Sequence, residues 1–259
     1  MYKGIFDSHA HYDDPRFDPD REEKLQELHR GGIEYIMNIG ADIPTSCMTV
    51  KLAEQYGFIY GAVGIHPSAV DNLPTDYLTT LEQLTASPRV KAIGEVGLDY
   101  HYEGYTEATQ KRVFVEQLNL AKRLDLPVII HSRDAHADTM DILQAHTPRG
   151  VVHCYSGSAE MAQQLVKLGL YIGFTGVVTF KNARRALEAV EAIPLERLVI
   201  ETDCPYLAPE PYRGQRCDSL MLGGVIEKMA QVKGVTPEEL IAHTTENAKK
   251  LYNISQAYM

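Results

Sequence analysis

The 259-residue chain lacks the features that mark secreted, disulfide-stapled or membrane-embedded proteins. Its four cysteines are scattered without a CxxC pair, which argues against a disulfide framework in a chain of this size. No apolar run approaches the length that crosses a bilayer. The first residues, MYKGIFDSHA, do not show the charged-then-apolar order of a signal peptide. We therefore expect a cytoplasmic protein that does not engage membranes.

Two cysteines, Cys154 and Cys204, directly follow the polar residues His153 and Asp203. If both cysteines lie on strands, the alternation of side chains turns their thiols away from those residues and toward packing helices. We expect both thiols to be buried as small hydrophobic groups rather than to bind metal.

Basic residues are too few for a broad grip on nucleic acid. The chain has 25 lysines and arginines against 35 aspartates and glutamates, which gives a formal charge of −10. Non-specific binding depends on neutralising phosphates with such cations, so the composition argues against it. A local phosphate site is compatible with this charge, because bound metal cations would dominate the field there.

Extended apolar runs recur along the whole chain and alternate with segments of helical spacing. Eight runs have this character: 3–11, 33–40, 58–67, 90–100, 126–132, 150–157, 170–178 and 197–205. Helices are expected between them, for example over 107–125, and one or two final helices over 219–254. Hydrophobic strands that alternate with helices indicate a parallel sheet covered by helices. Eight such units predict an α/β fold, a closed TIM (β/α)₈ barrel, as a single domain over 1–259 with extra C-terminal helices.

Five of the strand-like runs end in side chains that bind metals. These side chains are His9 and His11, Glu95, His131, His153 and Asp203. Any one of them could be a structural histidine or an ion-pair partner, but five strand ends equipped in this way by chance are improbable. Barrel active sites lie where the strands end, so the set predicts a hydrolytic metal site there. Four imidazoles and two carboxylates exceed the needs of one tetrahedral ion and favour two ions bridged by Glu95.

Seven segments along the chain form an ordered set of motifs: His9-Ala10-His11, GIHP at 64–67, GEVGLDY at 94–100, HSR at 131–133, HCYSG at 153–157, ETDCPYLAP at 201–209 and TTENAKKLY at 244–252. This set resembles the TatD family of metal-dependent deoxyribonucleases. The resemblance implies a TIM barrel among the amidohydrolase-like enzymes, two divalent ions and hydrolysis of DNA phosphodiesters. It implies one ion on His9, His11 and Asp203, the other on His131 and His153, and Glu95 shared as a catalytic ligand.

The resemblance also implies roles around the metals. Asp203 would orient or deprotonate the attacking water, and His66 and Arg133 would meet the substrate phosphate. An arginine fork suits phosphate oxygens, although His66 before a proline is equally suited to capping a turn. Tyr155 shares a face with His153 and could stack on a base or simply pack. Asp99, Asp7 and Glu201 are candidates to support ligands by hydrogen bonds.

One segment departs from the family pattern. Members commonly carry Arg-Asn-Glu-Pro after the last strand, whereas this chain has Arg216-Cys217-Asp218-Ser219. The departure leaves the metal ligands in place and bears on substrate range or rate.

Three functions follow in order of preference. The first is a metal-dependent deoxyribonuclease, expected as a monomer or weak oligomer that trims single-stranded or frayed DNA ends. The second is a hydrolase of a small phosphoester, lactone or amide on the same barrel, which the net acidity favours. The third is a non-catalytic metal-binding protein. The resemblance implies Mg²⁺, whereas imidazole-rich ligands by themselves suit Zn²⁺, Mn²⁺, iron or Ni²⁺.

Overall fold

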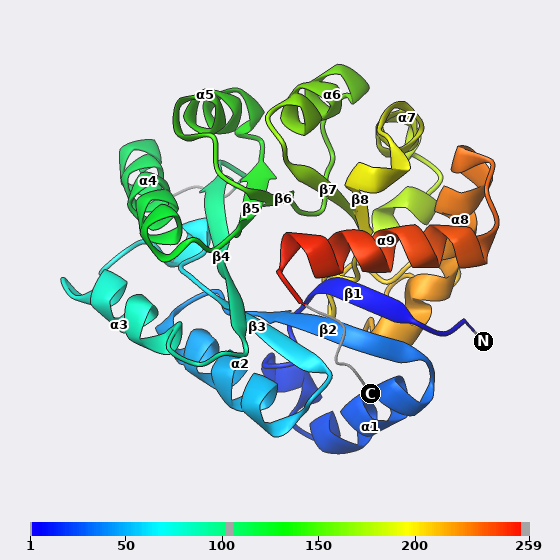
Figure 1. Cartoon of the computed structure of the whole chain (residues 1–259), viewed down its shortest axis with the longest axis horizontal. Helices are drawn as coiled ribbons and strands as arrows, with labels where there is room; N and C mark the ends of the chain where they lie inside the picture. The colour runs from blue at the N-terminus through cyan, green and yellow to red at the C-terminus, as the bar shows by residue number, and fades with distance from the viewer. Residues whose placement is uncertain (1, 102–105, 255–259) are drawn as a thin grey trace.

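The computed structural model describes residues 2–101 and 106–254. Its eight strands form one parallel sheet in the order β1 to β8 (Figure 1). The strands are β1 (Ile5–Ala10), β2 (Ile33–Ile39), β3 (Ile59–Val63), β4 (Val90–Asp99), β5 (Val128–Arg133), β6 (Gly150–Val152), β7 (Tyr171–Phe174) and β8 (Leu198–Ile200). Backbone bonds from Asp203 N to His9 O (2.9 Å) and from His11 N to Cys204 O (2.8 Å) join the last strand's end to the first. The predicted TIM-like barrel is confirmed.

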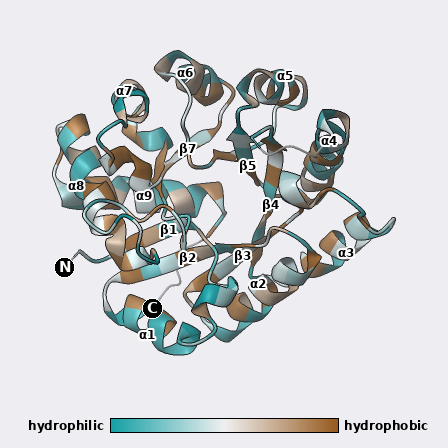
Figure 2. Cartoon of the chain, turned by 180° about the vertical axis from the view of Figure 1, so that it is seen from behind, coloured by the Kyte–Doolittle hydropathy of each residue, from teal (hydrophilic) through white to brown (hydrophobic). Residues whose placement is uncertain are grey.

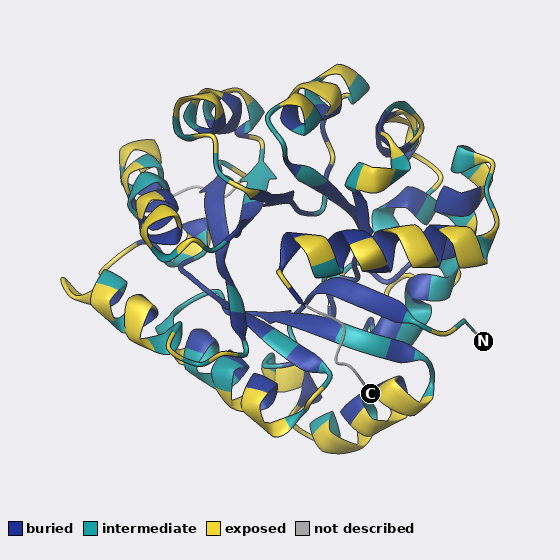
Figure 3. Ribbon diagram, viewed as in Figure 1, coloured by how far each residue is buried: buried dark blue, intermediate teal, exposed yellow. Residues whose placement is uncertain are grey.

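Helices surround the barrel and carry their apolar positions toward it. They are α1 (Arg21–Arg30), α2 (Ile43–Gln55), α3 (Tyr77–Leu84), α4 (Glu107–Leu124), α5 (His136–His146), α6 (Ala159–Lys167), α7 (Arg184–Ala192), α8 (Leu222–Lys233) and α9 (Pro237–Leu251). Hydrophobic and hydrophilic positions alternate along them (Figure 2). Exposed residues occupy their outer surfaces while the strands are mostly buried (Figure 3). This is the pattern of helices packed on a buried parallel sheet. In the described part of the chain, no helix has the length and apolar character needed to cross a membrane.

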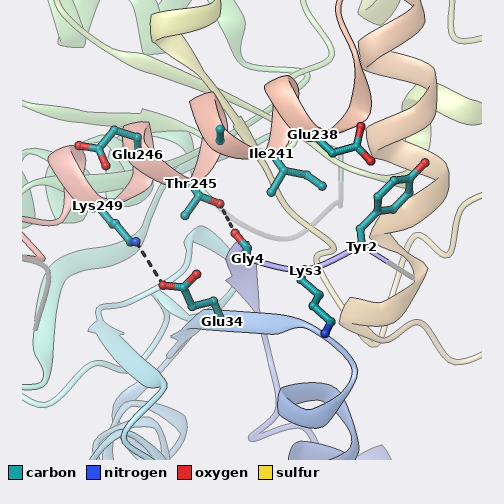
Figure 4. Close-up of a pocket in the computed structure, with 10 residues that line it drawn as sticks. Tyr2, Lys3, Gly4, Glu34, Glu238, Ile241, Thr245, Glu246 and Lys249 are labelled. Atoms are coloured by element: carbon teal, nitrogen blue, oxygen red, sulfur yellow. Dashed lines mark hydrogen bonds and ion pairs between the residues drawn. The ribbon is translucent and has the colours of Figure 1, made fainter. Parts of the chain in front are cut away.

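Helix α9 covers the end of the barrel where the strands begin. Thr236 and Glu239 form a capping box at its first turn, with Pro237 at the first helical position. Its Leu251, followed by Tyr252, packs with Phe6 and other residues of the lower barrel interior. This end also holds a shallow pocket, in which Thr245 donates to Gly4 O at 2.8 Å (Figure 4). In TIM barrels the functional site lies at the opposite end, where the strands finish.

Candidate metal centre

The six side chains predicted to bind metal lie together on the side of the barrel where the strands finish, although Glu95 lies inside β4 rather than past its end. His9 lies on β1, with His11 just past it, Glu95 lies on β4 and His131 on β5. His153 follows β6 directly, and its N donates to Ile130 O on β5 at 3.0 Å. Asp203 follows β8 in the left-handed region (φ 60°), a conformation that aspartate adopts more readily than most residues.

His9, His11 and Asp203 form the first ligand group. The Nε2 atoms of the two histidines lie 3.1 Å apart. Oδ1 of Asp203 lies 3.4 Å from Nε2 of His11 and 3.7 Å from Nε2 of His9. A tetrahedral ion with bonds of about 2.1 Å separates its ligand atoms by about 3.4 Å. The three atoms thus have the spacing of ligands around one cation.

Glu95 lies between this group and a second pair of histidines. Its Oε1 lies 2.8 Å from Nδ1 of His131 and 2.6 Å from Nε2 of His153. Its Oε2 faces the other way, 3.6 Å from Nε2 of His9 and 3.9 Å from Nε2 of His11. The carboxylate therefore offers one oxygen to each group, which is the arrangement of a bridging ligand.

The close spacing of the imidazole nitrogens suits neutral rings that bind metal cations better than rings that all carry protons. Nδ1 of His131 and Nε2 of His153 lie 3.1 Å apart, and the rings of His9 and His153 stack with centroids 4.0 Å apart. Burial and the neighbouring His153 lower the pKa of His9, whereas the charge of Glu95 overcomes burial and raises the pKa of His153. Adjacent rings cannot all hold protons, but neutral imidazoles can all donate lone pairs to metal ions.

Buried atoms behind the centre support the ligands. Nδ1 of His153 lies 3.7 Å from Oε1 of Glu201, and Nε2 of His131 lies 3.2 Å from Oδ2 of Asp99. Asp7 accepts from the backbone N of His9 at 3.4 Å and from Thr202 N at 3.0 Å. Among the described residues, Nδ1 of His9 and Nδ1 of His153 are the buried side-chain nitrogens without a hydrogen bond.

A pocket of about 650 Å³ opens over the centre. Its lining carries the carboxylates of Asp13, Asp14, Glu95, Asp99 and Asp203. Arg133 is the one arginine or lysine among the described residues that line it. With neutral histidines this wall is strongly acidic, so a phosphate can enter only when cations offset the carboxylates. Two divalent ions carry enough charge to do so.

His66 and Arg133 both line the pocket, His66 from just beyond β3 and Arg133 from the end of β5. His66 caps a short 3₁₀ helix (Pro67–Ala69) and accepts from Ser68 N through Nδ1 at 3.1 Å. Burial lowers the pKa of His66 to about 3, so the ring is neutral at physiological pH. Because Nδ1 accepts, the ring proton lies on Nε2, which is 3.7 Å from Oε1 of Glu95. His66 thus both caps a turn and presents a donor beside the centre.

The structure does not bring Tyr155 to the pocket. The ring is buried, packs edge-on against Phe174, and donates its hydroxyl to Ser158 O at 2.6 Å. The prediction for Cys154 was also wrong. Its side chain was expected to face the packing helices, but the residue lines the pocket. Strand β6 ends at Val152 and Cys154 has a φ of 44°, so strand alternation does not extend to either residue. Cys204 is fully buried, as predicted.

The departing segment 216–219 lies away from the pocket lining. Arg216 pairs with Asp20, and Ser219 donates to Oδ2 of Asp7 at 2.6 Å. The segment therefore contacts Asp7 of β1 through Ser219 and residues 16 and 20 through Arg216, without lining the pocket itself.

Several pocket residues were absent from the predictions. Asp13 and Asp14 follow His11 closely, and Tyr206 lies three residues beyond Asp203. Their nearness in sequence to predicted ligands was the available signal, but loop residues show no periodicity that tells which way they point.

The structure combines a parallel eight-stranded barrel with imidazoles and carboxylates gathered on the side where the strands finish. This architecture is that of the amidohydrolase-like metal-dependent hydrolases, and the chain belongs to that class.

Comparison with known proteins narrows the class. The sequence model of the family described as TatD related DNase matches residues 6–253. A Bacillus subtilis (strain 168) protein named "Uncharacterized metal-dependent hydrolase YabD" is 42% identical over 254 residues, covering 97% of this chain and 100% of the relative. The Shigella flexneri serotype 5b protein named "3'-5' ssDNA/RNA exonuclease TatD" is 34% identical over 261 residues, covering 97% and 100%.

A solved structure of a TatD homologue has the same fold as this chain. The crystal structure of YJJV, a TatD homologue from Escherichia coli K12, matches with a TM-score of 0.92 at 31% identity, covering 97% of this chain and 99% of that one. The chain belongs to the TatD family of metal-dependent hydrolases.

Proposed function

We propose that this protein is a deoxyribonuclease that hydrolyses the phosphodiester bonds of DNA from an end, using two divalent cations. One cation is held by His9, His11 and Asp203, the other by His131 and His153, with Glu95 shared. The observation that carries the proposal is the orientation of Glu95, whose two oxygens face the two histidine groups at 2.6–2.8 Å and 3.6–3.9 Å. The Shigella relative's name adds support for a nucleic acid substrate.

The residues of the chain have distinct parts in this reaction. Cations bound at the centre would polarise the phosphate and lower the pKa of the attacking water. Asp203 would accept the proton of that water. In the metal-free protein, hydrogen bonding to His11 overcomes burial and lowers the pKa of this carboxyl. Nε2–H of His66 and the guanidinium of Arg133 would bind phosphate oxygens and hold the diester in line.

A second candidate is a hydrolase of a small phosphoester, lactone or amide. The acidic pocket wall favours it, because five carboxylates and one arginine line the pocket, and this excess of negative charge repels a long polyanion. A third candidate is a non-catalytic metal-binding role, which the loss of a ligand would favour, whereas all six predicted ligands are present.

The deciding experiment is turnover by metal-stripped protein supplied separately with Mg²⁺, Mn²⁺ or Zn²⁺. Substrates are single-stranded DNA labelled at either end, the matching duplex, and a simple phosphoester and lactone. Stepwise shortening that needs metal and disappears in Asp203→Ala supports the nuclease, and the labelled end gives its polarity. If the DNA stays uncleaved while the phosphoester or lactone is hydrolysed, the nuclease proposal is wrong and the second candidate is supported.

A further inference from the structure

Two large hydrophobic side chains are exposed among the described residues, and both lie between β8 and α8. They are Tyr206, with 49% of its surface exposed, and Tyr212, with 44%. Tyr206 lines the pocket over the metal centre, whereas Tyr212 is not part of that lining. An accessible aromatic ring in the lining of a polar pocket is placed where it can contact a ligand.

Tyr206 is fixed in place from two sides. Its backbone N donates to Asp203 O at 2.9 Å, which ties it to a proposed metal ligand. The Cζ atom of Arg16 lies 4.1 Å from the ring centroid, in cation–π contact. Asp14 holds both partners: it accepts from Nε of Arg16 at 2.9 Å, from Nη2 at 2.8 Å, and from the Tyr206 hydroxyl at 3.4 Å.

This arrangement loses little entropy when a flat ligand stacks on it, because the ring is already oriented. The neighbours Val177 and Leu207 add apolar surface to the same pocket. The charge of Arg16 is matched by Asp14, so Arg16 supports the ring rather than attracting phosphates.

We propose that Tyr206, backed by Arg16, is the platform on which a nucleobase of single-stranded nucleic acid stacks while the adjoining phosphate occupies the metal centre. This inference rests on the proposed function and names its substrate class. A protein with a charge of −10 and one arginine in its pocket lining cannot depend on backbone charge for affinity. Stacking supplies affinity without cations and accepts every base. Bases within a duplex are already stacked, so the platform selects single strands or frayed ends.

The test uses Tyr206→Leu, which removes the ring, Tyr206→Phe, which keeps it, and Tyr212→Leu as the matched control outside the pocket. Each metal-loaded protein receives an oligonucleotide and its counterpart with abasic nucleotides at the cleaved end. Anisotropy of labelled strands gives Kd, and initial rates give kcat/KM. Metal content and melting temperature show whether each variant retains an intact centre.

Wild type and Tyr206→Phe should prefer the base-bearing strand, as should Tyr212→Leu. In Tyr206→Leu the preference should shrink by roughly 5- to 100-fold, with metal content unchanged. A preference that survives in Tyr206→Leu, or an equal loss on abasic strands, overturns the inference while leaving the nuclease standing. Base-dependent binding through Tyr206 without cleavage would sustain the platform and refute the nuclease. Neither binding nor cleavage of any strand would refute both.

Discussion

Nε2 of His131 lies 3.2 Å from Oδ2 of Asp99, while Nδ1 of the same ring faces Oε1 of Glu95 at 2.8 Å. The carboxylate of Asp99 thus fixes which nitrogen carries the proton and which one offers its lone pair to the centre. Asp99 also accepts from the backbone N of His101 at 2.9 Å, which holds the carboxylate itself in place.

Replacing Asp99 by Asn should therefore weaken metal binding without dismantling the barrel. An amide is a poorer acceptor for an imidazole N–H than a carboxylate, so we expect roughly a 10- to 100-fold loss in affinity for one of the two ions. Isothermal titration with the metal gives the affinity, and Asp141→Asn on the exposed face of α5 is the control. Unchanged affinity in Asp99→Asn would remove the positioning role.

Glu95→Gln should reduce the number of ions bound as well as the rate. The substitution keeps the shape of the side chain but removes the negative charge that faces both histidine groups. We expect the metal content measured by mass spectrometry to fall below two per chain and turnover to fall by at least about 100-fold. Glu188→Gln, an exposed partner of Arg184, should retain both. Two ions retained in Glu95→Gln would disprove a bridging role.

Metal affinity should rise with pH across the neutral range. In the metal-free protein, burial opposes protonation of His11, but the hydrogen bond and charge of Asp203 prevail and raise its pKa to about 9. Because a ligand must be deprotonated, binding at pH 7 displaces this proton, and affinity should increase with pH until about 9. Calorimetry in buffers of different ionisation enthalpy measures the release. Binding that releases no proton at pH 7 would contradict this assignment.

Ser219→Ala should destabilise the fold without changing the ligands. The hydroxyl of Ser219 donates to Oδ2 of Asp7 at 2.6 Å and lies 2.7 Å from the hydroxyl of Tyr12, all within the interior. Removing it leaves a buried carboxylate short of a donor, which costs about 1–3 kcal/mol of unfolding free energy. Urea unfolding checks this value. Ser87→Ala, which breaks a surface bond to Glu54, should stay within about 0.5 kcal/mol of wild type.

The barrel and the convergence of its ligand-type side chains could be predicted because both follow from local patterns. Each strand shows as a short apolar run, and closing eight parallel strands brings their ends to one rim. His9 and Asp203 are nearly 200 positions apart in sequence, yet the topology alone places them side by side.

The side-chain positions in the loops that follow the strands could not be predicted in the same way. The prediction for Tyr155 assumed that alternation continues past β6, and the left-handed Cys154 ends it. Tyr206 was missed because a loop aromatic has no periodic partner, and its contacts with Arg16, Asp14 and Asp203 become visible only in the structure. Backbone turns of this kind depend on tertiary contacts that one sequence does not display.

The junction between β1 and the segment after β8 also has a consequence for biosynthesis. Ligand atoms at positions 9 and 11 come from the first part of the chain to be translated, and the third member of their group comes from position 203. A nascent polypeptide therefore holds two of the three ligands of this group until residue 203 has been translated. Prematurely terminated products lacking Asp203 would be unable to assemble this ligand group, so metal capture by the group would mark a chain whose synthesis has passed residue 203.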